Sequence, residues 1–250
     1  MTFLEHLEEL RKRLFNSVIA VLIAFCVCCF FAKKIFYFVA LPLTAALGSG
    51  KKLAYMSLAE PFTLYMKIAF VAAIFLSAPC VIYQLWLFIS PGLFPRERGY
   101  AFPFIFFATL FFLLGGFFGY RVVFPTLCKF FLSVGEDFDP VLRINDYFSL
   151  FSKTLLGIAV VFEMPVLIFF LAKLGIITHT FMLKKWRWAI VIIFIIAAVL
   201  TPTPDMATQA AVAFPMLGLY FLSIGVAYFF GKKRNDAETE TPESGDEKPE

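Results

Sequence analysis

Residues 61–89 read PFTLYMKIAFVAAIFLSAPCVIYQLWLFI. This run is apolar over enough residues to cross the roughly 30 Å of hydrocarbon in a lipid bilayer as a helix. Similar runs precede and follow it, separated by short polar segments. Six membrane spans are predicted in all: Leu14–Val39, Pro61–Ile89, Tyr100–Tyr120, Leu150–Leu174, Trp186–Leu200 and Ala210–Phe230. The sequence therefore predicts an all-α membrane protein, a bundle of six transmembrane helices.

The composition agrees with lipid as the main solvent. Apolar residues make up 61% of the chain and charged residues 16%, and the mean hydropathy of +0.84 lies far outside the range of soluble globular domains. The 35 phenylalanines suit a lipid-facing surface because their side chains need no hydrogen-bond partner.

The sequence lacks the usual signals of catalysis. Its two histidines, His6 and His179, both lie in polar flanks, so a histidine-bound metal or a histidine base has little to build on. No nucleotide-binding loop, zinc-protease helix or nucleophile elbow occurs, and no pair of intramembrane aspartates suggests a protease. We expect no enzyme activity, no catalytic or metal-binding residues, no cofactor and no nucleic-acid partner.

The predicted topology places both termini in the cytoplasm. An even number of spans puts both ends on one side, and these ends carry the basic clusters Arg11–Arg13 and Lys232–Arg234. Basic residues in the loops of the other side reduce the charge asymmetry. Three parts are expected: a cytoplasmic amphipathic helix over residues 1–13, the six-span bundle over residues 14–231, and a disordered acidic tail over residues 232–250.

Two acidic side chains are candidates for binding a basic peptide. Glu9 lies in the N-terminal segment, where Glu9 with Arg13 and Glu8 with Lys12 have the i,i+4 spacing of surface ion pairs. Glu97 lies in the short connection between the second and third spans, where an ordinary headgroup-anchoring loop is the plainer interpretation. The sharper interpretation is that both carboxylates bind guanidinium groups in planar geometry.

Glu163 is a carboxylic acid deep within the fourth span. Its burial costs at least ~2 to 3 kcal/mol on insertion scales, so it is expected to face protein or water. Pro165 removes a backbone donor and predicts a bend in the helix. Two interpretations stay open: a polar spot in a concave, partly wet pocket, and a protonated acid hydrogen-bonded to a neighbouring helix.

Several motifs together resemble the TatC family, from His6 to about Pro215. They are HLEELRKRL at 6–14, SAP at 77–79, YQLW at 83–86, PGL at 91–93, ER at 97–98, FEMPV at 162–166 and TPTPDMATQ at 201–209. One departure is Phe221, at a position where many family members carry an acidic residue. The resemblance implies a concave helix bundle that receives the twin-arginine signal peptides of folded precursor proteins at the cytoplasmic face of the bacterial inner membrane.

The resemblance also assigns roles to individual residues. Glu9 and Glu97 form the acidic patch for the arginine pair, with Arg11 and Phe88 in support. A contact with a partner helix falls near the hairpin of the last two spans, at Thr201, Asp205 and Gln209, where helix capping and hydrogen bonds within the bundle are the plainer interpretation. The implied partners are TatA-like and TatB-like single-span proteins, further copies of the chain and membrane lipid, and the implied energy source is the protonmotive force.

Two other kinds of membrane protein are alternatives to this function. A proton-coupled transporter of a small solute would use Glu163, but no repeat relates the first three spans to the last three. A lipid-embedded enzyme lacks candidate catalytic groups.

The fifth span is short for the bilayer, and Pro215 interrupts the sixth, so this edge is expected to thin the membrane.

Overall fold

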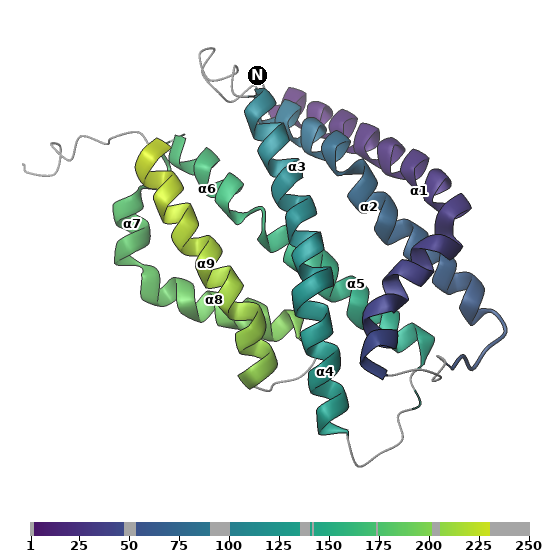
Figure 1. Ribbon diagram of the computed structural model, residues 1–250. Helices are drawn as coiled ribbons and strands as arrows, with labels where there is room; N and C mark the ends of the chain where they lie inside the picture. Colours follow the sequence, from purple (N-terminus) through teal and green to yellow (C-terminus); the bar gives the residue numbers. More distant parts are fainter. Residues whose placement is uncertain are drawn as a thin grey trace, which may run out of the picture.

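The computed structural model describes residues 3–47, 54–90, 101–135, 141, 143–173, 175–201 and 206–230. Nearly all of these residues are helical (Figure 1). The elements are α1 (Phe3–Leu47), α2 (Glu60–Ile89), α3 (Ala101–Phe118), a π-helical turn η3 (Gly119–Val123), α4 (Phe124–Val134), α5 (Ile144–Val161), α6 (Met164–Lys173), α7 (His179–Lys184), α8 (Trp186–Leu200) and α9 (Met206–Phe230). Within the described residues, five helical stretches are long and apolar enough to cross a membrane, and α8 is a shorter apolar helix. The predicted all-α membrane fold is confirmed.

The first helix is longer than the sequence suggested. α1 is a single helix of 45 residues. The helix is therefore not interrupted at residue 13, where the amphipathic segment was expected to meet the first span. No glycine or proline occurs between Phe3 and Val39, and the helix therefore has no intrinsic point of interruption there. That its first turns lie on the membrane surface stays a prediction.

The third span also extends further than predicted. Instead of ending at Tyr120, helix continues through η3 and α4, giving a stretch from Phe102 to Val134. Pro125 is the second residue of α4 and would interrupt an ordinary α-helix. The preceding π turn, closed by a hydrogen bond from the Phe124 amide to the Gly119 carbonyl, shifts the bonding register and lets the helix continue.

The fourth span is divided into two helices at the predicted bend. α5 ends at Val161 and α6 begins at Met164, with Pro165 as its second residue. At the junction, the Glu163 amide donates to the Val160 carbonyl over 3.1 Å, and the Glu163 carbonyl accepts from the Leu167 amide over 2.9 Å. The break therefore places Glu163 where one helix gives way to the next.

The helices form two groups joined by the long third span. α1 packs along α2 on one side, and α6, α7 and α8 surround α9 on the other, while α3 and α4 pass between them (Figure 1). α1 begins at the end of the bundle where α2 and α6 finish, called here the near end, and the opposite end is the far end. The predicted tail, residues 232–250, and the loop that contains Glu97 lie outside the described residues.

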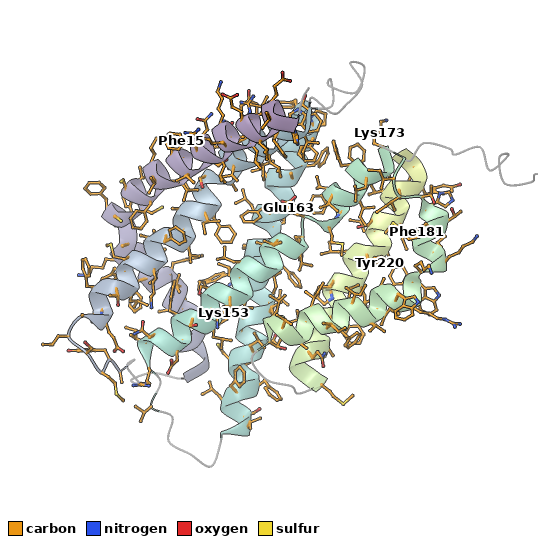
Figure 2. All side chains as sticks on the ribbon, turned by 180° about the vertical axis from the view of Figure 1, so that it is seen from behind. Phe15, Lys153, Glu163, Lys173, Phe181 and Tyr220 are labelled. Carbon is orange, nitrogen blue, oxygen red and sulfur yellow. The ribbon has the colours of Figure 1, made fainter. Side chains whose placement is uncertain are left out.

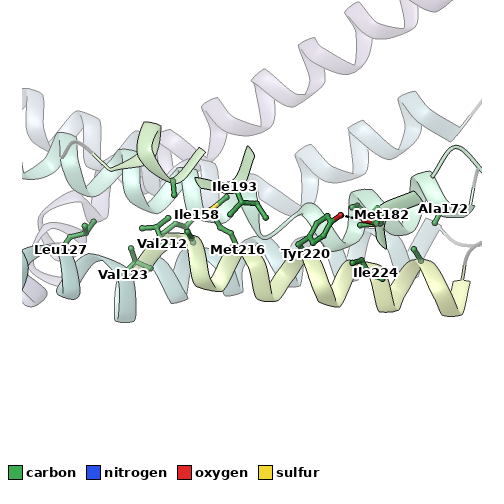
Figure 3. Packing of buried hydrophobic residues seen from close by; sticks show 14 residues of the cluster. Val123, Leu127, Ile158, Ala172, Met182, Ile193, Val212, Met216, Tyr220 and Ile224 are labelled. Carbon is green, nitrogen blue, oxygen red and sulfur yellow. Dashed lines mark hydrogen bonds between the residues drawn. The ribbon is translucent and has the colours of Figure 1, made fainter. Parts of the chain in front are cut away.

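Two large apolar clusters hold these groups together. One surrounds α9, with Tyr220 and Met216 buried against residues of the neighbouring helices (Figure 3). The Tyr220 hydroxyl within it is satisfied, because it donates to the Met182 carbonyl over 2.9 Å. The other cluster lies toward the far end, where the Phe124 ring packs edge-on against Tyr147 and Phe151.

Candidate functional site

The acidic candidate at the near end is held by an ion pair. Arg13 Nη2 donates to Glu9 Oε1 over 3.3 Å, which confirms one of the i,i+4 pairs predicted from the sequence. The Glu9 side chain is only 17% exposed. Its second oxygen, Oε2, is buried and has no hydrogen-bond partner among the described residues. The carboxylate therefore retains half of its acceptor capacity in a partly desolvated setting.

An aromatic stack joins the start of α1 to the last turn of α2. The rings of His6 and Phe88 lie 4.6 Å apart at an interplanar angle of 27°. Phe88 is half-buried, whereas Arg11 is exposed to solvent. This stack places the predicted site residue Phe88 beside the helix that carries Glu9. His6 was not predicted as part of the site, although it opens the N-terminal motif.

The other carboxylate of the predicted pair, Glu97, lies outside the described residues. Its loop follows directly after α2, whose last residues are Phe88 and Ile89. The chain therefore enters the loop from the stack with His6. Pairing of Glu9 with Glu97 stays a prediction.

A cavity of about 740 Å³ opens beside Glu163. Residues of α1, α2, α3, α5 and α6 line it, together with Glu163 itself, and apart from Ser77 and Glu163 their side chains are apolar. Glu163 Oε1 is buried and has no hydrogen-bond partner within the described part of the chain. Figure 2 shows the residue at the junction of α5 and α6. This geometry favours the concave-pocket interpretation over a hydrogen bond to a neighbouring helix.

The hairpin of α8 and α9 uses two of its three predicted contact residues internally. Thr201 is 4% exposed, and its hydroxyl donates to the Ala197 carbonyl over 2.9 Å at the end of α8. Gln209 Nε2 donates to the Phe194 carbonyl over 2.9 Å and thereby ties α9 to α8. Asp205 lies outside the described residues. The hairpin exposes apolar side chains near its connection, notably Val199 and Met206.

A polar group at the far end was missed in the sequence. Asn145, on α5, donates through Nδ2 to Glu60 Oε1 over 3.0 Å and accepts from Lys67 Nζ over 3.4 Å. Glu60 and Lys67 lie on α2, but Asn145 comes from a distant segment of the chain, so no spacing rule indicates that it joins them. The one available signal was Lys67, the single charged side chain within the run 61–89.

Comparison with known proteins identifies the family. The model of the family described as TatC, Sec-independent protein translocase protein, matches residues 5–215. The chain belongs to the TatC family. It is 43% identical to the Sec-independent protein translocase protein TatC of Koribacter versatilis over 247 residues, covering 98% of this chain and 91% of the relative. A relative of the same name from Helicobacter pylori strain J99 is 43% identical over 237 residues, covering 94% and 92%.

A solved structure agrees with this assignment. A crystal structure described as Twin Arginine Translocase Receptor TatC superposes with a TM-score of 0.77 at 34% identity, covering 89% of this chain and 97% of the solved one. The relatives are named as components of a protein translocase, which is a transport function rather than catalysis. The chain is thus a multi-span membrane protein of a translocase family, and this favours protein transport over the solute transporter considered for Glu163.

Proposed function

We propose that the chain receives twin-arginine signal peptides at the near end of the bundle, which faces the cytoplasm. The observation that carries the proposal is the Glu9 carboxylate, held by Arg13 through one oxygen and without a described partner at the other. A guanidinium group donates several N–H bonds in a rigid plane, so it matches such an acceptor better than an ammonium does. The partial burial of Glu9 strengthens a charged hydrogen bond formed there.

The second arginine of the signal is proposed to bind Glu97. The loop with Glu97 leaves α2 beside the stack of His6 and Phe88, and an arginine side chain can also stack on an aromatic face. Arg11 is exposed on the same helix as Glu9. Its positive charge is proposed to support the site by attracting acidic residues of a precursor to one side of it.

The apolar part of the signal is proposed to lie along the cavity beside Glu163. The lining of this cavity is apolar over most of its area and open to a helical or extended segment. In this proposal, Glu163 shapes the cavity during transport. Transport is driven by the protonmotive force, which fits the lack of a nucleotide-binding loop in the sequence.

TatA-like and TatB-like single-span proteins are proposed to dock on the hairpin of α8 and α9. Thr201 and Gln209 hold the hairpin through their internal hydrogen bonds, while Val199 and Met206 present apolar surface. Asp205, in the connection between the two helices, completes the contact. Further copies of the chain join the same complex.

The short fifth span is proposed to thin the bilayer at this edge. α8 has 15 residues and is therefore about 22 Å long, against ~30 Å of hydrocarbon. Lipids beside it shorten or tilt to cover its ends. Uniform bilayer thickness around the protein in nanodiscs, measured by cryo-electron microscopy, contradicts this part of the proposal.

The central test is binding of a labelled signal peptide to the purified chain in detergent. Peptides with Arg-Arg and with Lys-Lys are compared on the wild type, Glu9→Gln and Glu97→Gln, with Glu8→Gln as an exposed acidic control. Each site substitution is expected to weaken binding about tenfold, the effect of one charged hydrogen bond, and Lys-Lys is expected to weaken binding to the wild type. If all four proteins bind both peptides equally, the receptor site is wrong.

A further inference from the structure

A second cavity lies between α1, α2 and α5, toward the far end. Its volume is about 560 Å³. Unlike the cavity beside Glu163, it is lined by several polar side chains, namely Lys67, Asn145, Ser149 and Ser152, together with apolar ones. None of the described residues that line it is acidic. Leu156 lines both cavities, so the polar cavity adjoins the apolar one along α5.

Hydrogen bonds hold the ammonium group of Lys67 at this cavity. Because Glu60 accepts from the amide nitrogen of Asn145, the amide oxygen is the group turned toward Lys67. Glu60 is fixed in turn, since it also accepts from the backbone amide of Met56. The contact with Asn145 uses one of the three N–H donors of Lys67. Two donors stay available for a ligand.

The depth of Lys67 matches that of lipid headgroups. α2 has 30 residues and is about 45 Å long, so it exceeds the ~30 Å hydrocarbon layer by several ångströms at each end. Lys67 lies about 10 Å along the axis from Glu60, the first residue of the helix. Its ammonium group therefore lies close to the boundary between hydrocarbon and headgroups, where a charge without an anionic partner is costly.

We propose that this cavity binds the phosphate of a phospholipid from the leaflet at the far end, with one acyl chain extending past Leu156 into the apolar cavity while no signal peptide lies there. Lys67 supplies the positive charge, and the hydroxyl group of Ser149 donates to a phosphate oxygen, whereas the Ser152 hydroxyl donates to the Ser149 carbonyl over 3.2 Å. The absence of acidic side chains from the described lining favours an anion. The apolar lining beyond Leu156 favours a ligand with a hydrocarbon chain. In Figure 2, Lys153 lies on the same helix α5 and adds a further positive charge to this half of the bundle.

The test measures lipid binding to the purified full chain by native mass spectrometry, without signal peptide. Dioleoylphosphatidylglycerol is compared with dioleoylglycerol, which has the same acyl chains and no phosphate. The wild type is expected to prefer the phospholipid about tenfold. Lys67→Gln removes this preference and Lys67→Arg keeps it. Lys34→Gln is the matched control, because Lys34 is an exposed lysine on α1 over the ring of Phe31 and does not line the cavity. This variant leaves the preference unchanged.

A second variant tests the path of the acyl chain. Leu156→Trp fills the junction of the two cavities and is expected to weaken the binding of both lipids by a similar factor, with the preference for phosphate retained. Equal loss of the preference in Lys67→Gln and Lys34→Gln overturns the proposal, because the charge then acts through the general field of the protein. The proposal is also overturned if Lys67→Gln weakens signal-peptide binding and leaves the preference for phospholipid unchanged. In that case the cavity binds the signal peptide and not a lipid.

Discussion

The hydroxyl group of Tyr120 donates a hydrogen bond of 2.7 Å to the carbonyl oxygen of Phe38. In a regular α-helix that carbonyl accepts from the amide four residues later, but the residue there is Pro42, which has no N–H. The π turn after α3 therefore supplies the donor that the sequence of α1 lacks. The rings of Tyr120 and Phe38 also stack, with centroids 4.4 Å apart. The hydrogen bond and the ring stack together connect the C-terminal part of α1 to the π turn at the centre of the bundle.

Removing this hydroxyl is expected to destabilise the fold. Tyr120→Phe leaves the Phe38 carbonyl without this donor in a partly buried setting, at a cost of about 1 kcal/mol in the free energy of unfolding. Thermal unfolding in detergent measures the effect, with Tyr37→Phe, at an exposed position of α1, as the control. Pro42→Ala restores the backbone N–H, so Tyr120→Phe costs less in that background. An equal cost in both backgrounds contradicts the assigned role of Pro42.

A close approach of α3 and α5 leads to a second prediction. A Cβ atom at Gly115 would lie 2.9 Å from the Cα atom of Ala159 and 2.7 Å from Cβ of Phe162. Because the backbone of α5 cannot yield as a flexible side chain does, Gly115→Ala is expected to destabilise the protein by about 1 to 3 kcal/mol. Gly218→Ala in α9 is the control, since nothing lies within 4 Å of its new atom, and helix propensity predicts a neutral or stabilising effect. Similar melting temperatures for the two variants contradict the close packing of α3 on α5.

Substitution of Glu163 is expected to slow export without lowering the stability of the protein. The carboxyl group lacks a hydrogen bond to the described residues, so Glu163→Leu removes a buried polar group without leaving a partner behind. We expect an unchanged or higher melting temperature together with slower export of a folded precursor at equal protein level. Glu163→Gln, which keeps the shape of the side chain, shows whether the charge or the polarity matters. Unaltered export by both variants removes Glu163 from the mechanism.

The sequence identified the spans better than their ends and contacts. Hydropathy located each apolar run, because the bilayer imposes a minimum length on it. The third span was predicted to end at Tyr120, whereas the π turn carries the helix past Pro125. Contacts such as that between His6 and Phe88, or between Lys67 and Asn145, depend on how helices far apart in the chain pack together. No periodicity in a single helix encodes such pairs, and the motif resemblance indicated only the first of them in part.

The hairpin of α8 and α9 allows structural and docking roles to be told apart. Gln209→Met keeps the length of the side chain and removes its hydrogen bond to the Phe194 carbonyl, so both stability, by about 1 kcal/mol, and co-purification of a single-span partner are expected to fall. Met206 is 86% exposed, and Met206→Ser is expected to lower co-purification without changing the melting temperature, because it removes only apolar surface open to a partner. Both variants should still bind signal peptide, since the site with Glu9 lies at the near end. If Met206→Ser leaves co-purification unchanged while Gln209→Met lowers it, the effect of Gln209 comes from loosening the hairpin, and the partner docks on another face of the bundle.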